Sequence, residues 1–129
     1  MDYRQTRFFL ALALGGLTIA ACHRDAPIYS VQSDKFNGRA QLRQRTEQID
    51  RAGGELGWSM NTLRPGHIEA TLHLRENTAV VAIDYTPYTF SITYISSSPR
   101  LNYTGTQIHP SYNGWIERLE QRILVASSA

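Results

Sequence analysis

The middle of the chain alternates between apolar and polar residues, and this period of two constrains the fold more than any other feature. From His67 to Arg75 every second residue is apolar, and the same period recurs from Thr78 to Tyr85 and after Tyr88. Such alternation is typical of strands that bury one face. We therefore predict antiparallel strands with one apolar face that another layer must cover.

Two short turns bring the apolar positions of these strands onto one face. A turn at residues 76–77 places Leu72 opposite Val81, and a turn at residues 86–87 places Val81 opposite Ile92. Because side chains alternate between the faces, these registers are mutually consistent.

An earlier strand begins at Trp58, and its register depends on the loop that follows it. Trp58 and Met60 face inward only if the loop before His67 has an odd number of residues, as residues 64–66 would provide. A two-residue Pro-Gly turn would bury Asn61 instead.

Two amphipathic helices flank the strands. Residues 39–56 and the segment after Pro110 carry apolar residues at helical spacing, and His109 is suited to cap the second helix. The inward positions are Leu42, Thr46, Ile49, Ala52 and Leu56 in the first helix, and Tyr112, Trp115, Ile116, Leu119 and Ile123 in the second. We predict an α+β two-layer sandwich (α-β-β-β-β-α), in which both helices cover one face of a four-stranded antiparallel meander sheet.

The N-terminal segment has the organisation of a secretory signal. Arg4 and Arg7 precede an apolar stretch from Phe8 to Ile19, which is followed by two alanines and the chain's only cysteine, Cys22. Since a membrane-spanning helix needs about 20 apolar residues, we expect residues 1–21 to be removed rather than retained as an anchor.

The residues Ile19-Ala20-Ala21-Cys22 resemble the bacterial lipobox, in which the cysteine sulfur receives a diacylglycerol before cleavage. The alternative is an ordinary thiol at the end of a conventional signal, but a lone exposed cysteine is a liability in an oxidising compartment. The resemblance implies lipid attachment at Cys22. In Gram-negative bacteria an aspartate directly after the lipidated cysteine often means retention in the inner membrane. His23 stands at this position, which favours the outer membrane.

The rest of the chain is long enough for one domain. We expect residues 22–38 to be a flexible tether, since they show no sustained period, and residues 39–129 to form the domain. Loss of residues 1–21 would leave a formal net charge of +1 from the chain's +2. This balance does not favour a nucleic-acid partner.

Several short patterns point to a family. They resemble the patterns of a group of small, functionally uncharacterised lipoproteins of Gram-negative proteobacteria. The patterns are Gly57-Trp58-x-Met60, Ile68 to Leu72, Ala79 to Tyr85 and Ile108-His109-x-x-Tyr112-Asn113-x-Trp115-Ile116. The resemblance covers residues 28–123. It implies an envelope location and an α/β fold, but no catalytic residue.

Few residues are candidates for chemistry. Glu69 is expected opposite Asp84 on the open sheet face, with His73 further along, which would suit a small cation or ligand, although solvent usually tolerates such pairs. The histidines do not have metal-ligand spacing, and the serines lack a nucleophile motif. The tyrosines and tryptophans could line a groove for sugar or lipid, or form the rim of the core.

These observations favour a non-enzymatic protein without cofactor. We expect an accessory or assembly factor that is lipid-anchored on the periplasmic side of the outer membrane and has an envelope protein as partner. The alternative is a binding module for a small envelope ligand, a glycan, lipid or cation, on the open sheet face or the aromatic rim.

Overall fold

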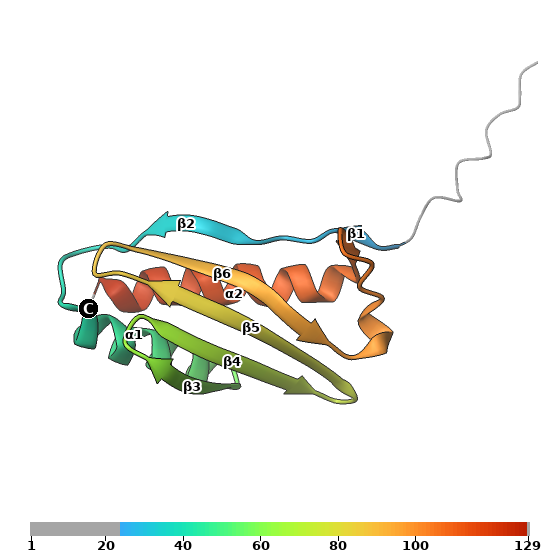
Figure 1. Cartoon of the computed structure of the whole chain (residues 1–129), viewed down its shortest axis with the longest axis horizontal. Helices are drawn as coiled ribbons and strands as arrows, with labels where there is room; N and C mark the ends of the chain where they lie inside the picture. Colours follow the sequence, from blue (N-terminus) through green and yellow to red (C-terminus); the bar gives the residue numbers. More distant parts are fainter. Residues whose placement is uncertain (1–23, 129) are drawn as a thin grey trace, which may run out of the picture.

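The computed structural model describes residues 24–128, so the signal segment and the residues Ile19 to Cys22 lie outside the described part. Figure 1 shows the arrangement of its helices and strands. In chain order these are β1 (Ala26–Pro27), β2 (Val31–Lys35), α1 (Leu42–Glu55), β3 (Trp58–Arg64), β4 (His67–Leu74), β5 (Asn77–Tyr85), β6 (Thr89–Ser97), the 3-10 helix η3 (Pro99–Leu101), β7 (Gln107–Ile108) and α2 (Pro110–Ser127).

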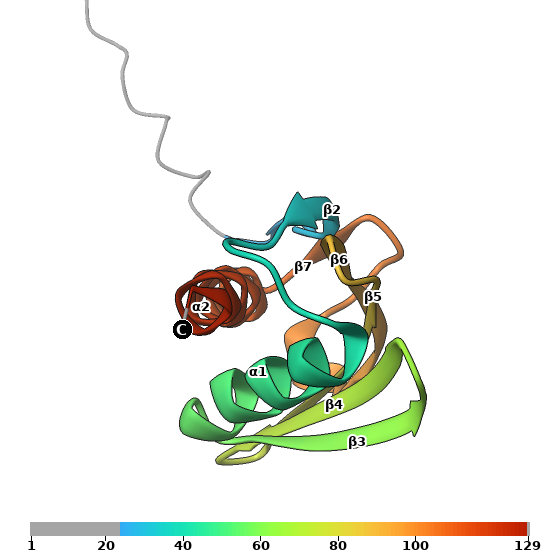
Figure 2. The same ribbon diagram turned by 90° about the vertical axis from the view of Figure 1, so that its left-hand side faces the viewer.

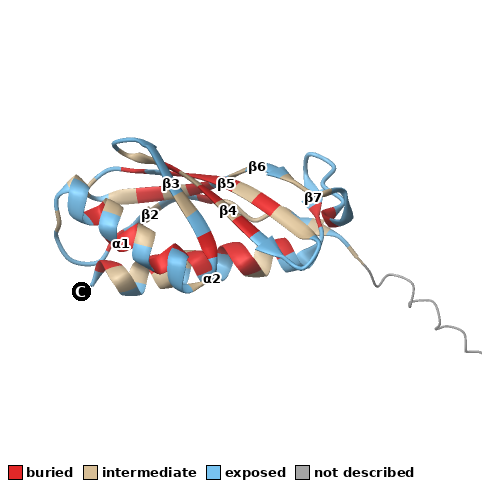
Figure 3. Cartoon of the chain, turned by 90° about the horizontal axis from the view of Figure 1, so that it is seen from below, coloured by how far each residue is buried: buried red, intermediate tan, exposed pale blue. Residues whose placement is uncertain are grey.

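The fold belongs to the predicted α+β class, with a larger sheet than expected. The strand order is β2-β6-β5-β4-β3, with all neighbours antiparallel, and β1 pairs with β7 in a separate two-stranded sheet. Both helices lie on the concave face of the large sheet (Figure 2). Buried residues gather where helices and strands face each other (Figure 3).

The fifth strand, β2, comes from the segment that the sequence analysis assigned to a flexible tether. Val31 is 4% exposed and Phe36 is 8% exposed, so this segment packs into the core and is not a flexible linker. An irregularity in the pairing with β6 between Val31 and Asp34 interrupts the period of two. The sequence pattern therefore lacked the alternation by which the other strands were recognised.

The predicted faces of β4, β5 and β6 are correct, but the predicted pairs on both sides of Val81 are displaced by two residues. Before Val81 a bulge shifts the pairing with β6 by one more residue, so that Ala79 pairs with Ser97. Ala70, not Leu72, pairs with Val81, which pairs in turn with Tyr94, not Ile92. The first turn lies at residues 75–76, one position earlier than predicted. A displacement by an even number keeps every side chain on its face, so the core remains apolar.

The second turn is longer than predicted because of Thr86. Its Oγ1 accepts hydrogen bonds from the backbone N–H groups of Tyr88 and Thr89, both at 3.0 Å. A threonine that bonds to the backbone in this way favours a turn over a strand. The connection between β5 and β6 therefore comprises residues 86–88, and Tyr85 pairs with Phe90.

A bulge resolves the alternatives that were open for β3. Two residues, Pro65 and Gly66, connect β3 to β4, yet Trp58 and Met60 face inward opposite Leu72 and Ala70. The register shifts by one residue between Thr62 and Arg64, and this compensates for the short turn. Gly66 has φ +83°, and a Cβ there would lie 2.9 Å from the carbonyl oxygen of Tyr85, so the turn requires glycine.

The helices follow the predicted apolar stripes. All five predicted inward residues of α2 are buried, and the Nδ1 atom of His109 caps the helix by accepting from the N–H of Ser111 at 3.0 Å. In α1, Gly53 lets the helix approach β3, because a Cβ there would lie 2.3 Å from the Sδ atom of Met60. Helix α1 therefore packs closely on the edge of the sheet despite the helix-weakening glycine.

The two tryptophans are predicted to stabilise the core. Trp58 is 5% exposed and Trp115 is 8% exposed, and both border a small hollow of about 130 Å³. Truncation of either to alanine should lower the free energy of unfolding by about 3 kcal/mol, because large apolar surface is lost and a cavity remains. Thermal unfolding tests this. An unchanged melting temperature for either variant would instead indicate a tryptophan displayed for ligand binding.

Candidate functional site

The predicted ligand-binding residues of the open sheet face do not come together as expected. Glu69 pairs with Ala82 rather than with Asp84, and the Oδ1 atom of Asp84 lies 2.5 Å from the Nδ1 atom of His67. His73 is four residues from Glu69 along β4, roughly 13 Å at the usual strand rise. Its Nδ1 atom lies 3.0 Å from the Oγ1 atom of Thr78. The displaced register therefore replaces the expected carboxylate pair with a histidine–aspartate contact.

Most of the aromatic residues belong to the core and its rim. Tyr85 and Tyr112 are buried, and Tyr94 stacks on Tyr103 with ring centroids 3.9 Å apart. Tyr88 differs, since it is 76% exposed at the turn between β5 and β6. This tyrosine borders a hollow near the start of α1.

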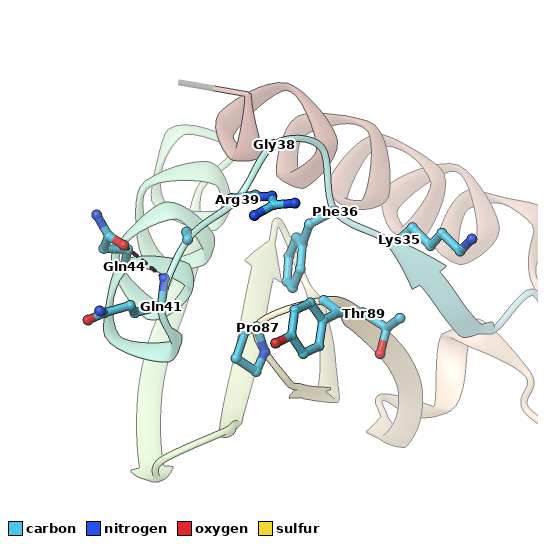
Figure 4. A pocket seen from close by; sticks show the side chains of 10 residues that line it. Lys35, Phe36, Gly38, Arg39, Gln41, Gln44, Pro87 and Thr89 are labelled. Carbon is cyan, nitrogen blue, oxygen red and sulfur yellow. Dashed lines mark hydrogen bonds between the residues drawn. The ribbon is translucent and has the colours of Figure 1, made fainter.

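That hollow, which we call the cleft, lies between residues 35–44 and the β5–β6 turn (Figure 4). Its volume is about 760 Å³. Lys35 and Arg39 supply positive charge, and Phe36 and Tyr88 supply aromatic surface. The lining residues are Lys35, Phe36, Gly38, Arg39, Ala40, Gln41, Gln44, Pro87, Tyr88 and Thr89, none of which is acidic.

A buried arginine, Arg45 of α1, holds both walls of the cleft together. It is 1% exposed, and its guanidinium stacks on Phe36 at 4.3 Å from the ring centroid. Its Nε atom donates to the carbonyl oxygen of Pro87 and its Nη2 atom to that of Gly38, both at 2.9 Å. Its Nη1 atom donates to the carbonyls of Asn37 and Ser127 and to the side chain of Gln48.

The charge of Arg45 has no carboxylate among these partners. Burial lowers the pKa of the guanidinium, but arginine remains protonated in proteins. A positive charge therefore lies behind the Phe36 wall, in addition to the charges of Lys35 and Arg39 at the surface. The cleft is suited to an anionic group attached to a planar or apolar body, which could contact Tyr88.

The sequence pattern does not reveal this site, for two reasons. Residues 35–38 belong to the segment predicted as a tether, and Arg45 is not among the inward positions predicted for its helix. One signal was present, because Arg45 lies three residues after Leu42 and four before Ile49, on the apolar stripe. An arginine at such a position indicates a buried cation with dedicated acceptors.

A second polar cluster joins Tyr29 and the following strand β2 to α2. The hydroxyl of Tyr29 donates to Oε1 of Glu120 at 2.5 Å, which raises the pKa of Tyr29 to about 12. Burial and the neighbouring Asp34 raise the pKa of Glu120, while the bond from Tyr29 opposes the shift. An acid whose pKa is raised by folding contributes stability below its unfolded pKa and loses it as the pH rises through the folded pKa.

We therefore expect Glu120→Gln to be more stable than the parent at pH 7.5. The amide keeps an acceptor for Tyr29 and gains a donor for Asp34, without the cost of a partly buried charge. Melting temperatures should differ by a few degrees at pH 7.5 and converge at pH 4, where Glu120 is protonated. A variant that is less stable at pH 7.5 would show that the carboxylate itself stabilises the contact.

Comparison with known proteins does not assign the chain to a family. No family model, curated protein or solved structure gives a significant match. Within residues 24–128, no helix is both long and apolar enough to cross a membrane. Proposals about function must therefore rest on the sequence motif at Cys22 and on the geometry of the domain.

Proposed function

We propose that this protein is a lipid-anchored, non-enzymatic accessory or assembly factor on the periplasmic side of the outer membrane. The observation that carries the proposal is the sequence Ile19-Ala20-Ala21-Cys22 at the end of an apolar segment. Acylation of the Cys22 thiol explains why the chain has a single cysteine and why this cysteine follows directly after the apolar segment and two alanines. Membrane attachment then depends on the lipid at Cys22, and we expect an envelope protein as the partner.

The resemblance to small lipoproteins is compatible with this proposal. Its most distinctive residues, Trp58, Tyr112, Trp115 and Ile116, are buried in the core, so the shared pattern reports mainly on the fold. A common fold is weak support for a common activity. The proposal therefore assigns this chain a place in the envelope and a mode of attachment, and no reaction.

A binding module for a small envelope ligand is the second candidate function, and the cleft favours it. The cleft combines the cationic side chains of Lys35 and Arg39 with the exposed ring of Tyr88. An acidic glycan or lipid fragment would complement this lining better than a cation would. The cleft therefore replaces the open sheet face as the binding surface that we propose.

Substitution of the anchor residue tests the first proposal. In Cys22→Ser no thiol can accept the diacylglycerol, so we expect an unprocessed or soluble form without acylation. Radioactive palmitate labelling and fractionation of the cell envelope measure this. Labelling that persists in the variant would exclude Cys22 as the attachment site.

Envelope extracts distinguish the two candidate functions. The lipidated parent, captured from detergent extracts, should retain a stoichiometric protein if it is an accessory factor, and a glycan or lipid if it is a binding module. Arg39→Gln with Tyr88→Ala should release the small ligand, whereas Arg43→Gln, exposed on α1 outside the cleft, is the matched control. Retention of the ligand by the cleft variant would exclude the cleft as its binding site.

A further inference from the structure

The fold begins so soon after Cys22 that it restricts where the domain can lie. Only His23 separates Cys22 from Arg24, and two residues span at most about 7 Å when fully extended. Strand β1 follows at once, with Ala26 paired to Ile108 in β7. A lipid on Cys22 would therefore hold β1 close to the membrane surface.

Strong contacts fasten this first segment to the domain. The N–H of Ile28 donates to the carbonyl of Thr106 at 3.0 Å. Asn113, in the first turns of α2, donates to the carbonyl of Pro27 at 2.9 Å and accepts from the N–H of Tyr29 at 2.8 Å. Residues 24–38 thus form no long tether that would let the domain turn freely, in contrast to the sequence-based expectation.

Figure 1 shows which end of the molecule this segment occupies. Strand β1 lies at one end of the long axis, together with the 3-10 helix after β6 and the turn between β4 and β5. The start of α1, the β5–β6 turn and the C-terminal end of α2 lie at the other end. The cleft, lined by residues 35, 36, 38–41, 44 and 87–89, is therefore remote from the attachment point.

The end that carries β1 has exposed side chains that are suited to contact lipid headgroups. Arg75 is exposed at its turn, Arg100 has a side chain 72% exposed, and Tyr103 is 40% exposed. The acidic residues there are Asp25 and Glu76, and Glu76 pairs with Arg100 at 3.0 Å through two exposed side chains. Such a surface pair is weak and can exchange for a phosphate.

Arg24 adds to this surface. It borders a shallow hollow of about 440 Å³ together with Asp25, Asn102, His109 and Pro110. Its Nε atom is buried without a hydrogen-bond partner among the described residues. The three arginines outnumber the two carboxylates, and this excess of positive charge favours an anionic partner at this end.

We propose that Arg24, Arg75, Arg100 and Tyr103 form an anchor face that contacts anionic phospholipid headgroups. Guanidinium groups bind phosphate with several donors, and tyrosine favours the membrane–water interface. The inference rests on the proposed lipidation of Cys22, and it adds an orientation. With the anchor face on the membrane, the cleft points away from it toward the periplasm.

Site-specific fluorescence tests the orientation with the full, lipidated protein. Because the thiol of Cys22 would be acylated, a cysteine introduced at Thr106 or at Tyr88 can be labelled alone. The labelled proteins are reconstituted in vesicles of phosphatidylcholine and phosphatidylglycerol that contain lipids with nitroxide-labelled headgroups. We expect several-fold stronger quenching at position 106 than at position 88. Equal quenching at the two positions, or stronger quenching at position 88, would overturn the proposal.

Charge reversal tests whether headgroup contacts set the orientation. Arg75→Glu with Arg100→Glu should remove most of the difference in quenching, whereas Arg43→Glu with Arg51→Glu, exposed on α1, should preserve it. Melting temperatures close to that of the parent show that the variants are folded. If the Arg75→Glu, Arg100→Glu variant does not fold, Arg75→Gln with Arg100→Gln takes its place. A folded anchor-face variant with undiminished quenching would overturn the headgroup contact.

Failure of the lipidation proposal would give a different result. The wild-type chain would then carry no acyl mass and would not stay on the vesicles before any label is introduced. A lipidated protein that stays on the vesicles but shows no preferred orientation would refute the anchor face alone.

Discussion

Replacement of Val81 by lysine should lower the free energy of unfolding by about 5 kcal/mol, enough to unfold much of the protein. Val81 is fully buried at the centre of β5, between Ala70 and Tyr94. A lysine there would leave an ammonium group without a partner in apolar surroundings, and its longer side chain would not fit the packed core. Unfolding by urea, followed by circular dichroism, measures the loss.

The neighbouring position provides a matched control. Ala82 faces the opposite side of the sheet, where it pairs with Glu69 and Thr93. Its own short side chain is 8% exposed, but Glu69 is half-buried and Thr93 is exposed, so solvent lies within reach of a longer side chain. A lysine at this position can extend to solvent beside Glu69, so Ala82→Lys should change the stability by about 1 kcal/mol or less. Similar losses for the two variants would mean that the assignment of β5 residues to the two faces is wrong.

Replacement of Arg45 by methionine should cost about 4 kcal/mol. Methionine fills a similar volume but donates no hydrogen bond, so the carbonyls of Gly38 and Pro87 and the side chain of Gln48 lose their donor. Buried acceptors without a partner carry a large desolvation penalty. The walls of the cleft should separate as well, because Arg45 connects the 37–38 loop with the β5–β6 turn.

Two further variants isolate this effect. Arg43→Met, on an exposed position of the same helix, should leave the stability within about 0.5 kcal/mol of the parent. Arg45→Lys should recover little, because an ammonium group cannot reach acceptors spread around a planar guanidinium. Full stability of Arg45→Lys would show that the charge matters and that the arrangement of donors does not.

The fold could be predicted from the sequence where side-chain periodicity is regular. The inward positions of β4 and β5, the buried stripe of α2 and the cap at His109 all follow from spacing and capping chemistry. The exact pairs could not be predicted, because the turn after β4 lies one residue earlier than expected and Thr86 bonds within the turn after β5 instead of extending that strand. Alternation determines the faces of a strand, but a displacement by two residues leaves the alternation unchanged.

The candidate site was harder to predict because it depends on contacts between distant segments. Arg45 meets residues 37–38, Pro87 and Ser127, which are far apart in the chain. Strand β2, whose end leads into the cleft, has an irregular register and no regular alternation. Sequence patterns of short range report on helices and strands, whereas this cleft arises from the way in which they pack.

The intact mass of the mature protein tests the central claim most directly. The protein is extracted from the envelope in mild detergent and measured by mass spectrometry, with fragmentation to locate the modification. We predict a chain that begins at Cys22 and carries a diacylglycerol and an amide-linked acyl chain on that residue. A chain that begins at another residue, or an unmodified Cys22, would contradict the account.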